Sequence, residues 1–218
     1  MPQSHQKRKD KGISPPDLPA FEQLSQWGET GLTAGELYSG LAATKVNLSN
    51  QVAKRVQFDR VNLNCVDLSG TTLLGFKLCD SRLSQCDLSN ADWHGAQILR
   101  VEMAECRMLG LTMTEGRLRD CVFMKCNGSY ERFRFASLNA IRFDECNLRE
   151  SDFQGADLSG IEFSRCDLRN AQMSGAKLKG ASLRGNKKPP ARGHRGLSKE
   201  STMRTLTTLL LPSLHRGK

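Results

Sequence analysis

A large apolar residue recurs at every fifth position through most of this chain. The register begins at Phe58 and reaches Leu183 without slipping, and 25 of its 26 positions are large and apolar, Gly128 being the exception. An α-helix repeats every 3.6 residues and a β-strand alternates every two, so neither would keep this register. The period therefore predicts a repeat architecture whose unit is five residues long.

The other positions of the five-residue unit are also regular. The position two before each large residue is usually small or β-branched, the positions beside it are polar, and glycine recurs two positions after it. Two inward positions per unit predict a short extended segment followed by a turn, and four such segments would close a roughly square coil of 20 residues. Successive coils would stack as parallel strands about 4.8 Å apart around one continuous core.

Residues spaced 20 apart provide a test of this coil. Five cysteines recur at that spacing, and another set of large residues ends in three phenylalanines. The two sets are Cys86, Cys106, Cys126, Cys146 and Cys166, and Phe123, Phe143 and Phe163. Stacked cysteines would have Cβ atoms about 4.8 Å apart with parallel vectors, a geometry unsuited to disulfides. We therefore expect both columns to form structural core, with the thiols reduced and buried.

Some segments state the unit plainly, such as ADLSG at 156–160 and CDLRN at 166–170. This pattern resembles the pentapeptide-repeat family of bacterial-type repeat proteins, whose consensus is close to A(D/N)LxG, and the resemblance covers about Val46 to Gly185. It implies an all-β fold, a right-handed quadrilateral β-helix or solenoid. Residues 56–185 would make 6.5 coils, a rod about 30 Å long at the spacing of parallel strands.

We expect three segments along the chain. Residues 1–44 would be a disordered basic arm followed by a helical cap, residues 45–185 the β-helix, and residues 186–218 a basic linker with a short amphipathic helix. Thr33–Glu36 resembles a capping box, which predicts a helix over the first coil. That helix would use Leu37, Tyr38, Leu41 and Ala42, with Phe21, Leu24 and Trp27 beside it.

The formal net charge of +9 is concentrated outside the repeat. Residues 1–55 hold 7 basic and 5 acidic side chains, residues 56–185 hold 17 of each, and residues 186–218 hold 8 basic and 1 acidic. A neutral rod with a basic tail favours only weak binding of nucleic acid or an anionic surface, through the tail. The tail would otherwise cap the last coil or support a homodimer through a terminus, or it is an accident of the reading frame. Its apolar residues at helical spacing are Met203, Leu206, Leu210, Leu211 and Leu214.

No sequence feature indicates catalysis, a cofactor or a metal site. The chain has no C-x-x-C pair, no phosphate-binding glycine loop and no nucleophile elbow, and it has only four histidines. Alternation along the unit turns His94 and Asp92 outward and Cys86 inward, so these neighbours do not converge. Cys65 and Cys79 fall on outward or turn positions, where chemical modification is plausible. We therefore expect no enzymatic activity.

One segment, Cys126 to Phe133, departs from the repeat. Gly128 replaces the large inward residue, and Glu131 occupies a small inward position. Because an unpaired buried carboxylate is costly, we expect a local bulge that turns Glu131 outward. The segment would be either a contact site or a bulge without a partner. The residues exposed at such a contact site would be Tyr130, Arg132 and Arg134.

Two classes of function follow. The favoured one is a non-enzymatic, cytoplasmic scaffold that binds another protein. We expect no membrane span, since the longest apolar run, Leu209 to Leu211, is far too short to cross a bilayer. The alternative, implied by the family resemblance, is a DNA mimic that acts on DNA gyrase or topoisomerase and gives quinolone resistance. The neutral rod departs from the acidic character of that branch, unless its charges are segregated onto different faces.

Overall fold

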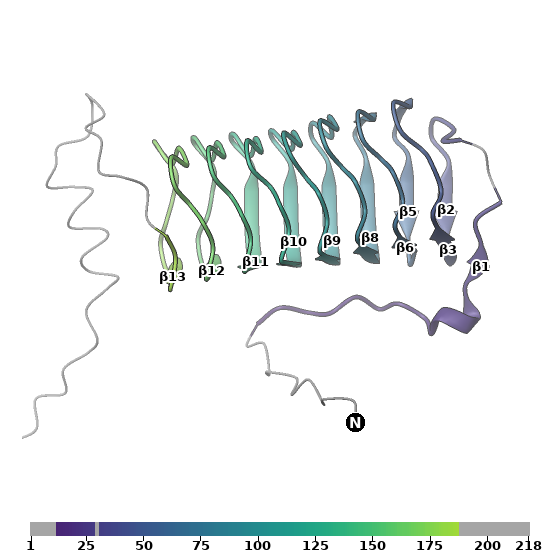
Figure 1. Cartoon of the computed structure of the whole chain (residues 1–218), viewed down its shortest axis with the longest axis horizontal. Helices are drawn as coiled ribbons and strands as arrows, with labels where there is room; N and C mark the ends of the chain where they lie inside the picture. The colour runs from purple at the N-terminus through teal and green to yellow at the C-terminus, as the bar shows by residue number, and fades with distance from the viewer. Residues whose placement is uncertain (1–11, 29–30, 188–218) are drawn as a thin grey trace, which may run out of the picture.

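The computed structural model describes residues 12–28 and 31–187 as a single β-solenoid (Figure 1). The chain is all-β, as the five-residue period predicts, and it winds into a quadrilateral β-helix whose coils stack along the long axis. The described residues contain no helix with the length and hydrophobicity needed to cross a bilayer. The predicted tail helix, from Met203 to Leu214, lies outside the described residues.

Thirteen short strands form the coils, preceded by one 3-10 turn. They are η1 (Phe21–Gln23), β1 (Ser25–Gln26), β2 (Leu37–Ser39), β3 (Leu41–Thr44), β4 (Val52–Lys54), β5 (Gln57–Asp59), β6 (Asn62–Asn64), β7 (Thr72–Leu74), β8 (Lys77–Ser84), β9 (Gln97–Ala104), β10 (Arg117–Met124), β11 (Ser137–Asp144), β12 (Glu162–Ser164) and β13 (Ser182–Arg184). Eleven strands belong to one parallel sheet, and β4 and β7 pair separately.

Every strand pair from β2 onward is parallel and joins residues 20 apart. Leu78 pairs with Ile98, and Leu118 pairs with Leu138. Isolated bridges such as Asp67 to Asp87 continue the same register where no strand is assigned. The square coil predicted from the five-residue period is therefore confirmed.

Each coil has four faces, which we name by their large inward residues. Face 1 carries Leu78, Ile98, Leu118 and Leu138; face 2 carries Leu83, Met103, Phe123 and Phe143; face 3 carries Leu88, Met108, Gly128 and Leu148; face 4 carries Trp93, Met113, Phe133 and Phe153. Face 4 therefore lies opposite face 2. All of these large side chains are buried in one continuous hydrophobic core.

Aromatic rings stack along the inside of the rod. On face 2 the rings of Phe123 and Phe143 lie 4.6 Å apart at 13°, and those of Phe143 and Phe163 lie 5.5 Å apart at 9°. On face 4 the rings of Phe133 and Phe153 lie 5.2 Å apart at 6°. Parallel coils therefore impose near-parallel stacking on identical side chains one coil apart, as the spacing in the sequence requires.

The corners between faces hold residues in the left-handed backbone region. Twenty non-glycine residues have φ between 47° and 62°, all at the last position of the five-residue unit. This conformation costs roughly 1–2 kcal/mol for an L-residue. Pairing between coils opposes that cost, because corner N–H groups donate to the next coil, as from Glu105 to the carbonyl of Met124 at 2.8 Å.

The predicted helical cap over Leu37–Ala42 is wrong, because this segment is the first coil of the solenoid. β2 pairs with β5 and β3 with β6 in the register of the later coils, so coiling begins before residue 45. The five-residue register extends back to Tyr38, which is buried, and Gly40 makes the corner with φ 65°. Coil pairing thus overrides the local capping pattern at Thr33–Glu36, which forms a turn rather than a helix start.

The N-terminal end is covered by a strand and a tryptophan. β1 pairs with β3, and the Trp27 ring stacks on the Tyr38 ring at 4.8 Å. The Tyr38 hydroxyl accepts a hydrogen bond from the N–H of Thr33 at 2.8 Å. These contacts protect the apolar edge of the first coil, which a β-helix must cover at its ends.

The last described coil is more exposed than the coils before it. Most of its inward side chains are only partly buried, with Ala181 buried, although they hold the positions that are fully buried elsewhere. The partly buried ones are Ala171, Met173, Ala176, Leu178 and Leu183. The two ends of the described rod therefore differ, since the N-terminal end is packed under Trp27 and β1.

Candidate interaction surface

The break in the repeat is filled by Glu131 rather than relieved by a bulge. Glu131 is fully buried, and its carboxyl occupies the space that a large side chain at Gly128 would fill, because a Cβ on Gly128 would collide with it. The expectation that Glu131 turns outward is therefore wrong. The physical reason is volume: removing the large side chain at one inward position leaves room for a larger one at the next.

The backbone passes through this break without any change of register. The N–H of Gly128 donates to the carbonyl of Asn147 at 2.8 Å, and the N–H of Asp152 donates to the carbonyl of Glu131 at 2.8 Å. Both carboxyl oxygens of Glu131 lack a hydrogen-bond partner among the described residues. Burial raises the pKa of Glu131 well above its ordinary value, because a charged carboxylate is poorly solvated in the core.

The outer surface of the same coil carries an unusual set of side chains, which we call rung 130–135. It consists of Tyr130, Arg132, Arg134 and Phe135 on face 4 and its two corners. Tyr130 and Phe135 are each 59% exposed, which is high for aromatic side chains in a protein whose other rings lie mostly in the core. Rung 130–135 therefore places two exposed rings at the edges of one face, with two arginines between them.

Part of rung 130–135 is held in place by the next coil. The Phe135 ring lies against Gly155, where an added Cβ would come within 2.6 Å of the ring, so only glycine at φ 68° leaves this space. The guanidinium of Arg134 lies 5.8 Å from the centre of the Phe135 ring and 3.6 Å from a carboxylate oxygen of Asp152. Arg134 and Phe135 are thus ordered, whereas no side-chain partner of Arg132 is found in the described residues.

The sequence pattern predicts Tyr130, Arg132 and Arg134 as contact residues, whereas it does not single out Phe135. Phe135 stands at the corner position, where two coils nearby carry Gly95 and Gly155. A large aromatic residue at a position that usually holds a glycine or a polar residue was the available signal. It was hidden because large apolar residues are expected throughout this repeat.

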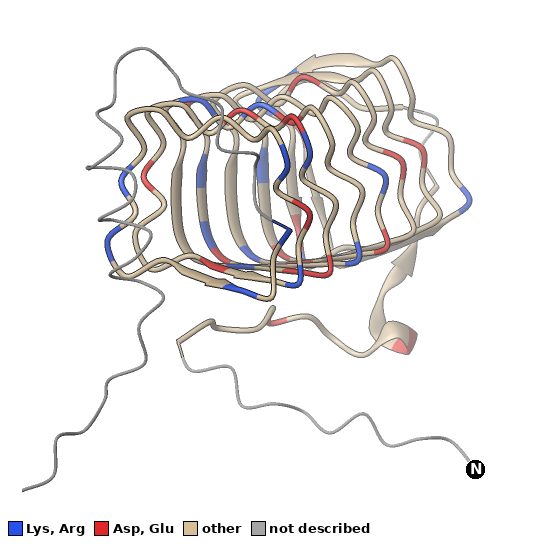
Figure 2. Ribbon diagram, turned by 60° about the vertical axis from the view of Figure 1, so that its left-hand side comes forward, with Lys and Arg blue, Asp and Glu red and all other residues tan. Residues whose placement is uncertain are grey.

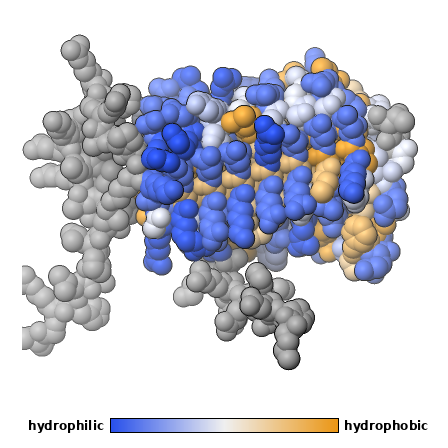
Figure 3. Space-filling model, viewed as in Figure 1, coloured by the Kyte–Doolittle hydropathy of each residue, from blue (hydrophilic) through white to orange (hydrophobic). Residues whose placement is uncertain are grey.

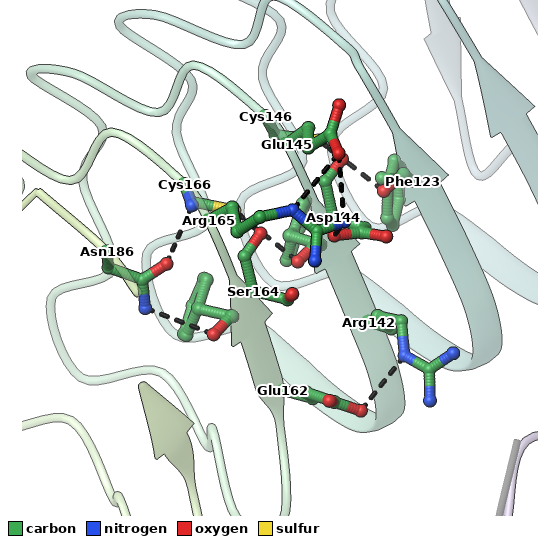
Figure 4. A network of polar contacts seen from close by, with 12 residues as sticks. Phe123, Arg142, Asp144, Glu145, Cys146, Glu162, Ser164, Arg165, Cys166 and Asn186 are labelled. Atoms are coloured by element: carbon green, nitrogen blue, oxygen red, sulfur yellow. Dashed lines mark hydrogen bonds and ion pairs between the residues drawn. The ribbon is translucent and has the colours of Figure 1, made fainter. Parts of the chain in front are cut away.

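The five cysteines form a buried column along one corner of the core. Each thiol lies near the carbonyl oxygen of the residue 23 positions earlier, as Cys146 does with Phe123 at 3.4 Å (Figure 4). Asn186 continues the column and donates to the carbonyl of Phe163 at 3.0 Å. A hydrogen bond with Cys126 and burial raise the pKa of Cys106 to about 12, so this thiol is protonated and not a nucleophile.

Asp and Asn side chains beside the large positions accept hydrogen bonds from backbone N–H groups in the turns. Asp92 accepts a hydrogen bond from the N–H of His94 at 3.1 Å, and Asp152 accepts one from the N–H of Gln154 at 2.9 Å. The imidazole of His94 is exposed and lies beside Glu115, with 4.0 Å between Nε2 and Oε2. No cluster of potential metal ligands occurs in the part of the chain that the structure describes.

Residues of both charge signs are spread along the rod, with basic and acidic positions interspersed (Figure 2). Pairs one coil apart include Arg82 with Glu102 at 2.7 Å and Arg142 with Glu162 at 2.9 Å. Arg165 reaches back to both Asp144 and Glu145 (Figure 4). The corner between faces 1 and 2 reads Arg60, Asp80, Arg100 and Asp120 from coil to coil. The described rod therefore has no continuous acidic stripe.

The middle of the rod matches a known repeat family. A family described as "Pentapeptide repeat region" matches residues 96–173. Residues 96–173 are a pentapeptide-repeat region. This matched region includes rung 130–135, and the coil register continues beyond it to β2 on one side and β13 on the other. No curated protein matches the chain.

Several solved structures are similar to this chain, including two described as pentapeptide-repeat proteins. HetL, involved in heterocyst differentiation regulation in the cyanobacterium Nostoc sp. strain PCC 7120, is 19% identical, with a TM-score of 0.40, over 75% of this chain and 91% of that chain. Full-length QnrB1, a plasmid-mediated fluoroquinolone resistance protein, is 18% identical, with a TM-score of 0.27, over 81% and 100%. A thylakoid lumen protein of Arabidopsis thaliana is 19% identical, with a TM-score of 0.24, over 66% and 72%.

Proposed function

We propose that this protein is a non-enzymatic scaffold that binds another protein through rung 130–135. The observation that carries the proposal is the pair of exposed rings, Tyr130 and Phe135, on either side of Arg132, which has no side-chain partner in the described residues. Tyrosine and arginine are enriched at the energetic centres of protein interfaces, and interfaces as a whole are rich in aromatic residues. Coil pairing on both sides fixes their backbone, which reduces the entropy lost on binding.

The surroundings of rung 130–135 make it a ridge. The coil before it carries Thr112 and Thr114 at the equivalent outward positions, and the coil after it carries Asp152 and Gln154, all shorter than arginine. Most of the surface seen in Figure 3 is hydrophilic. Among the described residues, Phe21 is the other large aromatic side chain that is exposed. The chemistry favours a partner with an apolar recess bordered by carboxylates, which would accept the rings and pair with the arginines.

The alternative, a DNA mimic that acts on DNA gyrase or topoisomerase, needs a strongly acidic face. Alternating charges on neighbouring coils, such as Arg82 and Glu102, argue against such a face and favour the scaffold. Rung 130–135 is itself basic. A supercoiling assay with and without a quinolone tests the alternative, and protection of gyrase by this protein would overturn our preference.

An affinity pull-down from the native host tests the scaffold. We expect a protein partner to be retained by the wild-type chain and lost when Tyr130→Ser and Arg132→Glu are combined, because both substitutions remove rung chemistry without touching the core. The matched control combines Met124→Ser and Lys125→Glu on face 2, which is opposite and also exposes an apolar and a basic side chain. Equal loss in both variants, or loss in neither, would contradict the proposal.

The basic tail and the cellular location form separate proposals. We infer a cytoplasmic protein, and we infer that residues 186–218, with 8 basic and 1 acidic side chains, supply any weak affinity for nucleic acid or anionic surfaces. Removing residues 188–218 is expected to abolish salt-sensitive DNA binding measured by a mobility shift. Binding that persists in the shortened chain would overturn the role of the tail. A homodimer formed through that terminus would be lost in the same variant, which sedimentation measures.

A further inference from the structure

Residues 12–20, which we call the arm, run along the outside of the rod. The arm lies beside the coils and travels against the direction in which they stack, as Figures 1 and 2 show. It has no regular secondary structure and contains Pro15, Pro16 and Pro19. Proline restricts φ to the range of a polyproline II helix, and Ala20, at the end of the arm, has φ −58° and ψ 147°, which are typical of that helix.

Two backbone hydrogen bonds attach the arm to the solenoid. The N–H of Ser14 donates to a carboxylate oxygen of Asp120 at 3.1 Å, and the N–H of Asp17 donates to one of Asp80 at 2.8 Å. Asp80 and Asp120 occupy the same corner position two coils apart, which is about 9.6 Å at the spacing of parallel strands. Three residues of polyproline II rise about 9.3 Å, so the arm and the coils share a common repeat.

The pattern of burial in the arm has the same period. Ile13, Pro16 and Pro19 are half-buried at every third position, Leu18 is half-buried between the last two, and Ser14, Pro15 and Asp17 are exposed. A polyproline II helix has three residues per turn, so one of its three edges faces the rod. The arm therefore presents an apolar residue and a backbone donor to the rod once every two coils.

The surface under the arm is built by the corner between faces 1 and 2, which we call the corner groove. Its corner positions hold Arg60, Asp80, Arg100, Asp120, Ala140 and Gly160. The guanidinium of Arg100 forms a bidentate pair with Asp80, which holds the pKa of that carboxyl below its usual range and fixes it as an acceptor. The small residues Ala140 and Gly160 then open a hollow of about 270 Å³ beside Gly12 and Ile13.

The attachment of the arm is slight compared with the attachment of a coil. Over residues 12–19 the described contacts include two hydrogen bonds to the rod, whereas neighbouring coils are joined by backbone bonds along every face. Half of the arm side chains face solvent. A peptide with the same backbone form and register can therefore replace the arm without any change in the solenoid.

We propose that the corner groove is a docking site for an extended, proline-containing segment of a partner protein, and that the arm occupies it as a competitor within the same chain. The groove selects for two backbone N–H groups three residues apart, neither on proline, and for proline or an aliphatic residue at every third position. A tethered competitor acts at an effective concentration of about 1 mM, so the intact chain binds such a segment weakly. This site is separate from rung 130–135 and does not depend on the function proposed for it.

A fluorescent peptide, GISPPDLPA, which reproduces residues 12–20, tests the proposal by anisotropy. The receptor is the full chain with residues 13–19 replaced by glycine and serine, compared with the wild-type chain. We expect binding to the replaced-arm chain to be at least ~10-fold tighter, because the competitor has been removed. A peptide methylated on the backbone nitrogens of Ser14 and Asp17 should bind at least ~10-fold more weakly, since it lacks both donors.

Three results would overturn the proposal: no binding to either chain, equal binding to both, or binding that ignores N-methylation. A dimer in which two copies exchange arms would also overturn it, and sedimentation of the wild-type chain across concentrations detects this. If the replaced-arm chain loses its β-sheet circular dichroism, the wild-type chain is used instead. Excess peptide must then accelerate hydrogen exchange at Ser14 and Asp17, and unchanged exchange contradicts the proposal.

Discussion

The segments Leu88–Trp93 and Gly128–Phe133 hold the same positions two coils apart but fill the core differently. The first uses leucine, alanine and tryptophan, and the second uses glycine, glutamate and phenylalanine. The backbone is nearly the same in both, with the N–H of Ala91 donating to Leu88 at 3.2 Å and that of Glu131 donating to Gly128 at 3.3 Å. Pairing between coils therefore sets the backbone, and the core accepts volume moved from one inward side chain to the next.

The largest expected effect is loss of a ring from a regular column. Phe143→Ala removes a side chain that stacks on Phe123 and Phe163 and should lower the free energy of unfolding by ~3–5 kcal/mol. Phe135→Ala, on the exposed rung, should cost less than ~1 kcal/mol. Urea unfolding of both variants makes the measurement. Similar losses would show that the distinction between core columns and the rung is wrong.

A second prediction tests whether the Glu131 side chain fills the space that Gly128 leaves in the core. Gly128→Leu restores the repeat at one position but drives leucine into the buried carboxyl of Glu131, so it should destabilise the fold by ~1–3 kcal/mol. Adding Glu131→Ala removes the obstacle and a buried, unpaired polar group, so the double variant should be more stable than wild type. A double-mutant cycle by urea unfolding measures this coupling. Additive effects of the two substitutions would contradict it.

Glu131 should also make stability depend on pH in a direction opposite to that of a surface carboxylate. Burial raises its folded pKa, so below the unfolded pKa both states are neutral and the fold has its full stability. As pH rises, only the unfolded state ionises, and stability falls by up to ~1.4 kcal/mol per pH unit until the folded pKa is reached.

Glu131→Gln is the matched control, because it keeps the shape and cannot ionise. Unfolding midpoints of both proteins between pH 4 and pH 7 make the measurement, with all other carboxylates common to the pair. The difference in stability, wild type minus variant, should decrease steadily as pH rises. A constant difference would mean that Glu131 is not buried in the folded protein.

The smallest expected effect separates stability from binding on rung 130–135. Tyr130 has φ 62°, so Tyr130→Gly relieves a left-handed residue and should stabilise the protein by ~0.5 kcal/mol after the greater chain entropy of glycine is counted. Ser129→Gly, one residue earlier and outside the left-handed set, should destabilise it instead. Thermal unfolding compares the two. Partner binding should fall only in the Tyr130 variant.

The features of the fold that could be predicted from the sequence are those that the five-residue register controls. The closed coil and its stacked aromatic and cysteine columns follow from spacing alone, because every coil repeats the same backbone pairing. The first coil was misread as a helix because Thr33–Glu36 satisfies a local capping pattern, while Tyr38 already lay in the register. The helix predicted from this local pattern does not form, because β2 pairs with β5 one full coil further along the chain.

The remaining differences are matters of three-dimensional contact. Glu131 was expected outside because burial of an unpaired carboxyl is costly, but the space left beside Gly128 admits its side chain into the core. The arm could not be predicted, since Ser14 and Asp120 are 106 residues apart and only the coil register brings Asp80 and Asp120 into one line. The exposed position of Phe135 could not be predicted without knowing that Gly155 of the next coil lies beneath its ring.

The arm also affects the order in which the coils of the rod unfold. In a solenoid each coil touches only its neighbours, so coils fray from an end one at a time. The arm crosses several coils and is hydrogen-bonded to Asp120 and Asp80, so it restrains these coils relative to one another. The coils between Asp80 and Asp120 must then open together or release the arm first, and a segment that replaces the arm in the corner groove would restrain the same coils through the same two acceptors.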